Sequence, residues 1–581
     1  MVNPQNMKDR AAEISIEVPA NRIVKLRGAI ISLGAPSNAH DWTCSIYCPV
    51  KNKIFVIDVA VLMGIKKFSL TNDGDYNKRS FSYVKTVCDK IFRFCQDVLG
   101  INEFDSIIYK LEWGPNRGKR NFDISNFSRM IAFEFTRKFN CEKFVELTFP
   151  EHNELHALGA YYNSGFKKSF FLAYDAGCGS TNFLTGGIDK NQVVFSLGYP
   201  YQIHFCLSAY LAQKLIPMTN PRKVWELDIA GKVMGHSAYF KALYPNYDEK
   251  KYRGVVDILK NSAVVREYQK RDHNITRLYE ECPDTEESIM SLTSAMQEAH
   301  NECVVDFFYK DDLYKSIKEN WDNNLCMSGG SSLNVLTNEI IRKEFGFNVF
   351  VPADPGDSGL SEALLQQYLN DVLGIPPTII GSETNVPLMD LKSPPSPSKI
   401  ISLEQLCSLF RKGKIIGFLE GNVEYGPRAL GKRSILCDPS YKNMKDKINK
   451  NVKNREWYRP FAPVCKLEDA HIYFDRDRFD DLSTMSFAVN VKDEYKEQLS
   501  SITHVDGTAR LQTVTREQNP VLYGILNTFG GVLLNTSFNV SGKPILNSLE
   551  SAMTVLNETE LDCVVWYDGE NYNLYEKNVD L

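Results

Sequence analysis

The stretch SFFLAYDAGCGSTNFLTGG, residues 169–187, decides the expected fold of this chain. Ser169–Tyr174 is an apolar and aromatic run that predicts a buried strand, and Asp175 opens a glycine-rich loop directly after it. A related block begins about 140 residues earlier at Gly28, where GAIISLG, CSIYCPV, a KNK turn and IFVIDVA follow one another. Three short strands with a tight turn fit the opening β-meander of an actin-like domain. The second block therefore indicates a duplicated fold.

The remaining sequence has an α/β pattern in which strands, glycine turns and helices follow one another. Residues 375–399 contain six prolines and several serines, which exclude a helix interior or a central strand there. A helix is expected after PDTEE, with Asp284 and Glu287 as its capping box. The predicted segments are an N-terminal arm or short extra strand (1–27), a duplicated actin-like module (28–374), a linker (375–399) and a second α/β module (400–581).

The overall composition is that of an ordinary globular protein with several domains. The chain has 581 residues, of which 43% are hydrophobic and 24% charged, and a net charge of −5 gives no global argument for nucleic-acid binding. Its 14 cysteines form no CxxC pair, which favours a reduced intracellular protein over a disulfide framework or a zinc knuckle. No apolar run reaches roughly 18 residues and the start has no apolar leader, so we expect a cytoplasmic protein without a membrane span.

Two histidines and two aspartates form a candidate metal site. His152 and His156 in EHNELHALGA are four residues apart, so on a helix they lie one above the other and can share a metal ion. Asp175 and Asp357, the latter in ADPGDSG, would add hard oxygen ligands from glycine-flanked loops. A helix that merely carries two surface histidines would show the same spacing.

The segment SGGSSLN, residues 328–334, is a candidate phosphate loop because it follows a predicted strand and opens a helix. The backbone amides of Gly329 and Gly330 would face outward at a positive helix end, which suits a nucleotide phosphate. Asp357 follows the next strand, and ligands of α/β sheets gather at such strand ends. A glycine pair is also common in ordinary tight turns.

Four arginines in the C-terminal half predict an anion site. Arg428, Arg433, Arg459 and Arg510 each lie among glycine, proline or small residues rather than on an amphipathic face. A guanidinium group matches phosphate oxygens with two parallel hydrogen bonds. A solvated basic face is the competing interpretation. Short polar side chains that could contribute further contacts are Ser434, Asn535, Thr536, Ser537 and Asn539.

His40 and Asp41 follow the first predicted strand in SNAHDWTCS. An imidazole has its unperturbed pKa near the working pH of most enzymes, so His40 could act as a general base toward an acceptor hydroxyl. A single histidine is more often structural, so this role needs further support.

The sequence resembles the ATP-dependent O-carbamoyltransferases, a family typified by nodulation protein U and the cephem 3-hydroxymethyl carbamoyltransferase. The resemblance runs from about Ile30 to Leu574 and is strongest in EYGPRALGKRSIL, YRPFAP and LLNTSFNVSGKPI. It implies an actin-like (ASKHA) module with ATP and a metal, joined to a carbamoyl-phosphate-binding α/β module that resembles the threonylcarbamoyl-AMP synthase fold.

The resemblance also implies a two-step reaction. Carbamoyl phosphate and ATP give carbamoyl-adenylate, pyrophosphate and phosphate, and the carbamoyl group then moves to an alcohol. The resemblance assigns metal ligation, with Fe²⁺ preferred over Mn²⁺ or Mg²⁺, to His152, His156, Asp175 and Asp357, and nucleotide binding to Gly329, Gly330, Asn334 and Asp357. It assigns carbamoyl phosphate binding to Arg428, Arg433, Ser434, Arg459, Arg510, Asn535 and Ser537. The implied catalytic residues are His40, Asp41 and Lys67.

Two departures from the family pattern concern the actin-like module. Where members carry an acidic-arginine run followed by a Lys-His pair, this chain reads IDVAVLMGIKKFS, with Lys67 nearest to the lysine and Phe68 in place of the histidine. The loop after Asp175 reads AGCGST where members tend to have a glutamate. Both changes lie on the expected acceptor side.

The acceptor alcohol is the open question. Small natural products are the family's usual acceptors, and a hydroxymethyl-pyrimidine in DNA, such as 5-hydroxymethylcytosine, is the second candidate, for a bacterial or virus-infected bacterial cell. The mixed basic and aromatic segment Tyr109–Arg129 is compatible with DNA and equally with a solvated loop. A tRNA threonylcarbamoylation fusion and a non-catalytic nucleotide-binding module are two competing functions. A homodimer is possible, and no membrane partner is expected.

Overall fold

The computed structural model describes most of the chain, and all structural statements below refer to that part. The described residues are 14–18, 22–34, 42–63, 81–110, 124–141, 143–147, 151–175, 183–199, 226–261, 278, 282–283, 285–377, 381–384, 395–477, 482–540 and 543–577.

Two sheets in the N-terminal half share one strand order. The first sheet runs β13-β5-β4-β3-β6-β7 and the second runs β10-β9-β8-β11-β12. Each contains an antiparallel meander followed by two parallel strands. The matching strands are β3 (Ala29–Ser32), β4 (Thr43–Cys48), β5 (Lys53–Asp58), β6 (Phe104–Lys110) and β7 (Lys143–Leu147), and β8 (Lys168–Tyr174), β9 (Phe183–Asp189), β10 (Gln192–Tyr199), β11 (Asn324–Ser328) and β12 (Asn348–Phe350).

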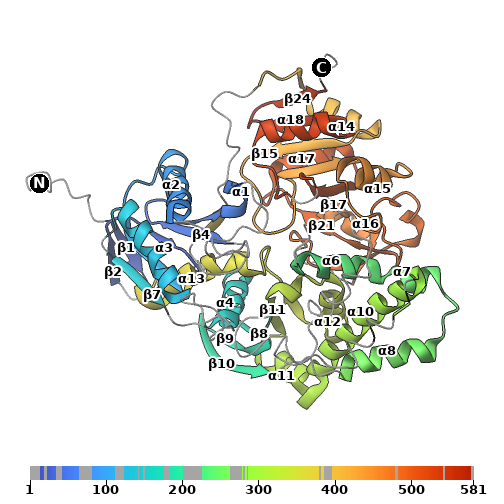
Figure 1. Ribbon diagram of the computed structural model, residues 1–581, viewed down its shortest axis with the longest axis horizontal. Helices are drawn as coiled ribbons and strands as arrows, with labels where there is room; N and C mark the ends of the chain where they lie inside the picture. Colours follow the sequence, from blue (N-terminus) through green and yellow to red (C-terminus); the bar gives the residue numbers. More distant parts are fainter. Residues whose placement is uncertain are drawn as a thin grey trace, which may run out of the picture.

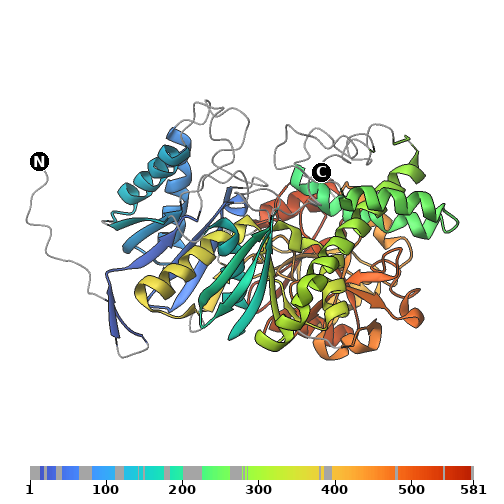
Figure 2. The ribbon, with the colours of Figure 1, turned by 90° about the horizontal axis from the view of Figure 1, so that it is seen from below.

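This repeat confirms the duplicated fold that the sequence indicates. Two helices, α4 (His152–Ser164) and α13 (Leu360–Tyr368), pack against each other between the two sheets (Figures 1 and 2). Helix α13 lies on β4 of the first sheet, and α4 lies on β8 of the second. Helices α2 (Phe81–Asp97) and α3 (Ile124–Lys138) pack together beside the first sheet.

A helical segment is inserted between β10 and β11. Its long helix α10 begins after the N-cap Thr285, whose side chain accepts a hydrogen bond from the Ser288 amide. The predicted Asp284–Glu287 capping box is therefore wrong, because a residue with an extended backbone one position later caps the helix. The helices of the segment are α6 (Glu226–Ser237), α7 (Tyr239–Leu243), α8 (Glu249–Asn261), α10 (Glu286–Tyr309) and α11 (Leu313–Asn320), before α12 (Val335–Phe345).

The C-terminal half is built on an eight-stranded mixed sheet of order β14-β24-β23-β15-β16-β22-β17-β21, with a small sheet β18-β19-β20 beside it. Its strands are β14 (Lys399–Ile401), β15 (Ile416–Glu420), β16 (Arg433–Cys437), β17 (Ala462–Lys466), β18 (Phe474–Asp475), β19 (Ala488–Val491), β20 (Thr508–Arg510), β21 (Gln512–Val514), β22 (Leu533–Ser537), β23 (Cys563–Tyr567) and β24 (Tyr572–Glu576). Its helices include α14 (Leu403–Arg411), α15 (Met444–Lys447), α16 (Ala470–Tyr473), α17 (Pro520–Phe529) and α18 (Leu549–Glu558).

The two halves share a continuous hydrophobic core. One cluster of buried side chains contains Leu172 and Met327 of the second N-terminal sheet together with Ile435 and Leu534 of the C-terminal sheet. Burial of apolar side chains from both halves in one cluster favours a fixed arrangement of the halves. Loops at the edges of these two sheets can therefore contribute to one site.

The segment expected to be a linker contributes a strand. Within residues 375–399, β13 (Gly381–Thr384) pairs in parallel with β5 at the edge of the first sheet. An edge position needs hydrogen bonds on one side only, which reconciles a strand with the surrounding prolines. At the N-terminal end, β1 (Ile14–Val18) and β2 (Arg22–Leu26) form an antiparallel pair, in line with the predicted extra strand. No helix in the described ranges is long and apolar enough to cross a membrane.

Candidate metal centre and anion site

The four predicted metal ligands converge. Single ligand atoms of His152, His156, Asp175 and Asp357 all lie within 4.8 Å of one another. The Nε2 atoms of the two histidines are 3.1 Å apart. Asp357 Oδ1 lies 3.4 Å from each of these nitrogens, and Asp175 Oδ2 lies 3.5 Å from that of His152. The four side chains thus point at one common centre.

These separations fit a bound divalent cation. Ligands at about 2.1 Å from a metal are about 3.0 Å apart in octahedral geometry and about 3.4 Å apart in tetrahedral geometry. The separations of 3.1, 3.4, 3.4 and 3.5 Å agree with these values to within about 0.1 Å. Burial raises the pKa of Asp175, but the contact with His152 outweighs it, and the pKa is lowered to about 2. The carboxylate is therefore ionised at neutral pH, as a ligand must be.

Each ligand is placed by the end of a regular element. His152 and His156 lie one turn apart on α4, which begins with a capping box between Glu151 and Glu154. Asp175 follows β8, and Asp357 starts a short turn after β12. The hydroxyl of Thr43 donates to the Ser358 carbonyl oxygen at 2.5 Å, which ties the Asp357 turn to the first sheet.

The glycine loop after β11 holds the metal ligand Asp175 rather than offering free amides. The Gly330 amide donates to Asp175 Oδ1 at 3.0 Å, and the Gly329 amide donates to the Pro355 carbonyl at 2.8 Å. Gly329 has φ +85°, and a Cβ there would lie 2.3 Å from the Tyr174 carbonyl oxygen, so only glycine fits. The expectation that these two amides face a phosphate is wrong, because both already have protein acceptors.

Asn334 also has a structural task. Its Oδ1 accepts from the Thr337 amide and so caps α12, while its Nδ2 donates to Gln297 Oε1 at 3.0 Å. The side chain is buried, and both of its ends are engaged. A nucleotide at this loop would have to use other atoms than the Asn334 amide.

Three predicted arginines form a cluster, and a fourth arginine that the sequence pattern did not single out joins them. Burial and the charges of Arg428, Arg459 and Arg455 lower the pKa of Arg510. Burial and Arg459 lower the pKa of Arg428 to about 10, so it remains a cation at neutral pH. Positive charges held together in a partly buried place are what an anion site requires. We call Arg428, Arg455, Arg459 and Arg510 the arginine cluster.

Arg455 was not predicted although it lies in the stretch KNREWYRP. Its Nε donates to Asn449 Oδ1 at 2.6 Å, and its guanidinium lies 4.5 Å from the centre of the Phe461 ring. These contacts hold the charge close to Arg459. The signal in the sequence is the spacing of Arg455 and Arg459, four residues apart beside two prolines and aromatic residues.

Arg433 does not belong to the arginine cluster, which corrects its predicted role. It lies on β16 with no solvent exposure, and its guanidinium donates to the carbonyl oxygens of Glu420, Gly421 and Lys432. Glu424 Oε1 accepts from the backbone amides of Leu430, Lys432 and Arg433. Arg433 and Glu424 therefore shape the GPRALGK loop that carries Arg428, and Arg433 is structural.

The small polar residues predicted near the anion are mostly engaged with protein groups. Ser434 Oγ accepts from the Gly431 amide at 3.0 Å, and Asn535 Nδ2 donates to the Ala429 carbonyl at 3.0 Å. Both contacts hold the loop around Arg428. Ser537 and Asn539 surround the buried Lys453, whose Nζ donates to the carbonyl oxygens of both residues. Lys453 was not predicted.

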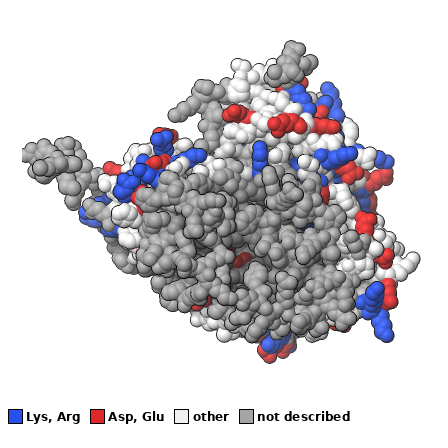
Figure 3. All heavy atoms as spheres, viewed as in Figure 1, with Lys and Arg blue, Asp and Glu red and all other residues white. Residues whose placement is uncertain are grey.

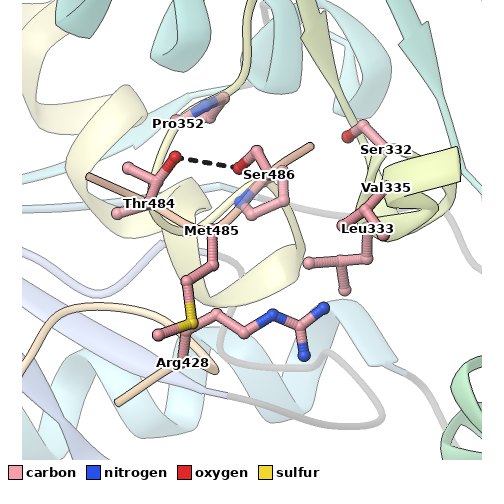
Figure 4. A pocket seen from close by; sticks show the side chains of 10 residues that line it. Ser332, Leu333, Val335, Pro352, Arg428, Thr484, Met485 and Ser486 are labelled. Carbon is pink, nitrogen blue, oxygen red and sulfur yellow. Dashed lines mark hydrogen bonds between the residues drawn. The ribbon is translucent and has the colours of Figure 1, made fainter. Parts of the chain in front are cut away.

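A small cavity links the two halves of the chain at Arg428. It has a volume of about 10 Å³, the space of about one water molecule, and is lined by Ser332 and Leu333 of the glycine loop, Ala353 and Pro355 of the Asp357 loop, and Arg428 of the C-terminal half, among others. Figure 4 shows the Arg428 guanidinium below Leu333 and the Met485 side chain next to Arg428. Met485 has φ +57°, an uncommon conformation for this residue type, and its neighbours Thr484 and Ser486 share a hydrogen bond of 2.9 Å.

The cavity wall is completed by a close approach of backbone. Gly426 has φ +91°, and a Cβ there would lie 2.2 Å from the Ala353 carbonyl oxygen. The arginine loop and the Asp357 loop are thus in direct contact, which brings the metal ligands and the arginine cluster to the same region.

Several residues expected on the acceptor side lie outside the described ranges. They are the predicted catalytic residues His40, Asp41 and Lys67, together with Phe68, most of the basic and aromatic segment (111–123) and the whole AGCGST loop (176–181). Their predicted roles therefore stay predictions.

Two family models match two separate parts of the chain. A family model described as Carbamoyltransferase N-terminus matches residues 77–362, and one described as Carbamoyltransferase C-terminus matches residues 407–569. Nodulation protein NolO of Bradyrhizobium diazoefficiens is 32% identical over 443 residues, which are 71% of this chain and 77% of that protein. The 3'-hydroxymethylcephem-O-carbamoyltransferase of Streptomyces clavuligerus is 34% identical over 256 residues, which are 42% of this chain and 48% of that protein.

Among solved structures, the alignment with the ethanolamine utilization protein EutJ from Carboxydothermus hydrogenoformans covers 57% of this chain and 88% of the EutJ chain. The sequence identity is 12% and the TM-score is only 0.26. The two family models and the long match to NolO are much stronger, and they lie over the two modules that hold the metal ligands and the arginine cluster. The chain therefore belongs to the carbamoyltransferase family and is a transferase enzyme.

Proposed function

We propose that this enzyme is an ATP-dependent O-carbamoyltransferase that uses carbamoyl phosphate as the carbamoyl donor and a hydroxyl group as the acceptor. The observation that carries the proposal is the arginine cluster beside a cavity whose other wall holds the metal-ligand loop. Carbamoyl phosphate and ATP are both polyanions, and cationic groups in a confined site attract and orient them.

The phosphate of carbamoyl phosphate is assigned to Arg428, Arg459 and Arg510, with Arg455 added. Ser434 of β16 and Asn535 and Ser537 of β22 would support this site from the neighbouring strands. We also propose that residues 400–581 form a carbamoyl-phosphate-binding module of the threonylcarbamoyl-AMP synthase type. The N-terminal module would hold ATP near the glycine loop and Asp357.

His152, His156, Asp175 and Asp357 would hold a divalent cation, with Fe²⁺ preferred over Mn²⁺ or Mg²⁺. When bound, such a cation supplies positive charge next to phosphate oxygens. The mixture of imidazole and carboxylate ligands suits a transition metal of borderline hardness better than Mg²⁺, which prefers oxygen ligands. Asp175 would keep this ligand set joined to the glycine loop through Gly330.

The reaction balances in three bond changes. Water hydrolyses carbamoyl phosphate to carbamate and phosphate. A carbamate oxygen then attacks the α-phosphorus of ATP and releases pyrophosphate, which leaves carbamoyl-adenylate. Finally the acceptor hydroxyl attacks the carbamoyl carbon, loses its proton to a base and releases AMP. The labile intermediates need to stay between the modules, because bulk water would hydrolyse them.

His40, paired with Asp41, is proposed as the base that accepts the hydroxyl proton, and Lys67 is proposed to contribute on the acceptor side. Replacement of His40 by alanine would leave formation of carbamoyl-adenylate nearly intact and abolish transfer. Loss of both half-reactions would contradict this assignment.

Two acceptor classes are proposed: a small-molecule alcohol, or a hydroxymethyl-pyrimidine in DNA such as 5-hydroxymethylcytosine. The relative from Streptomyces clavuligerus is named for a small hydroxymethyl acceptor, which favours the first class. On the face shown in Figure 3, lysine and arginine side chains lie among aspartate and glutamate side chains over the C-terminal half. Binding to DNA that weakens steeply with salt would favour the second class.

The test is mass spectrometry after incubation of the enzyme with ATP, carbamoyl phosphate and either hydroxymethylated DNA or a panel of alcohols. One added carbamoyl group identifies the acceptor. ATP consumption that requires carbamoyl phosphate excludes a non-catalytic nucleotide-binding module. ATP consumption that requires threonine and bicarbonate instead would identify a threonylcarbamoylation enzyme and overturn the proposal.

A further inference from the structure

A buried ion pair joins the helical segment to the arginine cluster. Lys232 of α6 is 7% exposed and its Nζ lies 2.7 Å from Oε1 of Glu456, which is 8% exposed. The other carboxylate oxygen, Oε2, lies 3.6 Å from the guanidinium NH1 of Arg459. One carboxylate therefore stands between a lysine of the N-terminal half and an arginine of the proposed phosphate site.

Glu456 is a potential competitor of the substrate phosphate. A carboxylate next to a guanidinium group can form the same paired hydrogen bonds that a phosphate forms. Burial raises the pKa of Glu456, but the hydrogen bond from Lys232 and the charges of Lys232 and Arg459 outweigh it and lower the pKa. Glu456 is thus a full negative charge beside the arginine cluster, and its shorter contact is with Lys232 rather than with Arg459.

The docking of α6 and α7 fixes the place of Lys232. The ring Nε2 of His504 lies 2.9 Å from the Gly235 carbonyl oxygen, and Lys445 Nζ donates to the Tyr239 hydroxyl at 2.8 Å. Gly235 of α6 also lies close to the loop before β17, because a Cβ at Gly235 would lie 3.3 Å from Cδ of Pro460. These contacts, a few residues further along the chain, hold the ammonium group of Lys232 against Glu456.

We propose that Lys232 and Glu456 are positioning residues that set the affinity of the arginine cluster for phosphate groups. Lys232 neutralises Glu456 and draws its carboxylate away from Arg459, so that Arg459 is available to an anion. This inference rests on the proposed function only where it identifies the anion as carbamoyl phosphate. The binding of a phosphate group by the arginine cluster does not depend on that identification.

A purely structural ion pair is the competing explanation. Removal of one partner of any buried pair destabilises a protein, whether or not a binding site is nearby. The two explanations differ in the affinity for phosphate measured on folded protein. A structural pair changes stability alone, whereas a positioning pair changes anion affinity in opposite directions when its positive and negative members are removed.

The experiment is a double-mutant cycle of Lys232→Met, Glu456→Gln and the double variant on the full chain. Calorimetric binding of inorganic phosphate, the KM for carbamoyl phosphate and the KM for ATP are measured together with thermal stability. The matched control is Lys241→Met, because Lys241 also forms a 2.7 Å ion pair within the helical segment, with Glu298, but is 47% exposed.

Lys232→Met is expected to weaken phosphate binding and raise the KM for carbamoyl phosphate about tenfold, because Glu456 turns to Arg459, with the KM for ATP unchanged. Glu456→Gln is expected to tighten phosphate binding about threefold, and the double variant to lie within about threefold of wild type. Lys241→Met should match wild type.

Unchanged phosphate affinity in Glu456→Gln overturns the inference, even if Lys232→Met fails to fold. It is also overturned if the double variant binds phosphate as weakly as Lys232→Met, or if wild-type protein binds no phosphate. Phosphate binding that follows the cycle in a protein that never consumes carbamoyl phosphate would support the inference and refute the proposed function.

Discussion

Asp175 connects the metal-ligand set to the glycine loop: its Oδ1 accepts the Gly330 amide hydrogen at 3.0 Å, while its Oδ2 lies 3.5 Å from His152 Nε2. One carboxylate thereby fixes a backbone turn from a neighbouring strand and presents an oxygen to the centre of the four ligands. The same residue carries a structural and a ligand function, and the two can be separated by substitution.

Asp175→Asn is expected to lose the metal while keeping the turn. The amide oxygen can still accept from Gly330, but the negative charge that favours a cation is gone. Asp175→Ala is expected to lose both the metal and the turn. Its free energy of unfolding should be lower by about 1–3 kcal/mol, because the buried Gly330 amide is left without its acceptor. Metal content by elemental mass spectrometry and chemical denaturation distinguish the two. Equal metal content in both variants and wild type would refute the ligand role.

His156→Ala is expected to remove bound metal and carbamoyl transfer together, because a cation site loses one of its four ligands. His471→Ala is the control, since His471 lies exposed on α16 in the C-terminal half. Treatment of wild type with a chelator should reproduce the loss, and addition of Fe²⁺ should restore activity to wild type but not to His156→Ala. Full activity of the chelated enzyme would contradict the proposal.

Arg428→Met and Arg433→Met should behave differently although Arg433, the first residue of β16, directly follows the loop that carries Arg428. Arg428 lines the cavity, so its loss is expected to raise the KM for carbamoyl phosphate at least about tenfold with little change in stability. Arg433 is fully buried, and its guanidinium group donates hydrogen bonds to backbone carbonyl oxygens. Its replacement is therefore expected to lower the free energy of unfolding by about 3 kcal/mol or more. Steady-state kinetics and denaturation curves measure both. The reverse pattern would show that the two roles are exchanged.

Gly426→Ala is expected to separate the arginine loop from the Asp357 loop. The new Cβ would lie 2.2 Å from the Ala353 carbonyl, so the backbones must move apart, and activity should fall by more than about tenfold. Gly421→Ala is the matched control: Gly421 also has a positive φ, of +50°, but no atom lies within 4 Å of the new Cβ. The control should lose only about 1 kcal/mol of stability from the left-handed backbone. Equal activities would show that the contact of the loops is not needed.

Stability should fall on mild acidification because of His236. Burial lowers the pKa of His236 to about 4, so the folded protein binds its proton only at lower pH than the unfolded chain does. Between about pH 6.5 and pH 4 the unfolded state therefore takes up more protons, and this one residue removes about 2 kcal/mol of stability by pH 5. His236→Gln should show a smaller drop from pH 7 to pH 5 in denaturation experiments. An equal drop in both proteins would refute the assignment.

The sequence by itself determined the features that depend on neighbours along the chain. The spacing of His152 and His156 places both rings on one face of a helix, whatever the rest of the fold does. The apolar run before Asp175 places this carboxylate at a strand end, and the run before ADPGDSG places Asp357 in the loop that follows the next strand. The second strand and its aspartate and glycine loop indicate that the fold is duplicated.

Only the tertiary structure decided which groups were already engaged. The sequence context singled out Arg433 and not Arg455, but the guanidinium of Arg433 donates to backbone carbonyls and Arg455 belongs to the arginine cluster. The amides of Gly329 and Gly330 are engaged by Pro355 and Asp175, which are distant in sequence. Hydrogen-bond partners of this kind come from segments brought together by the shared core, and local spacing carries no information about them.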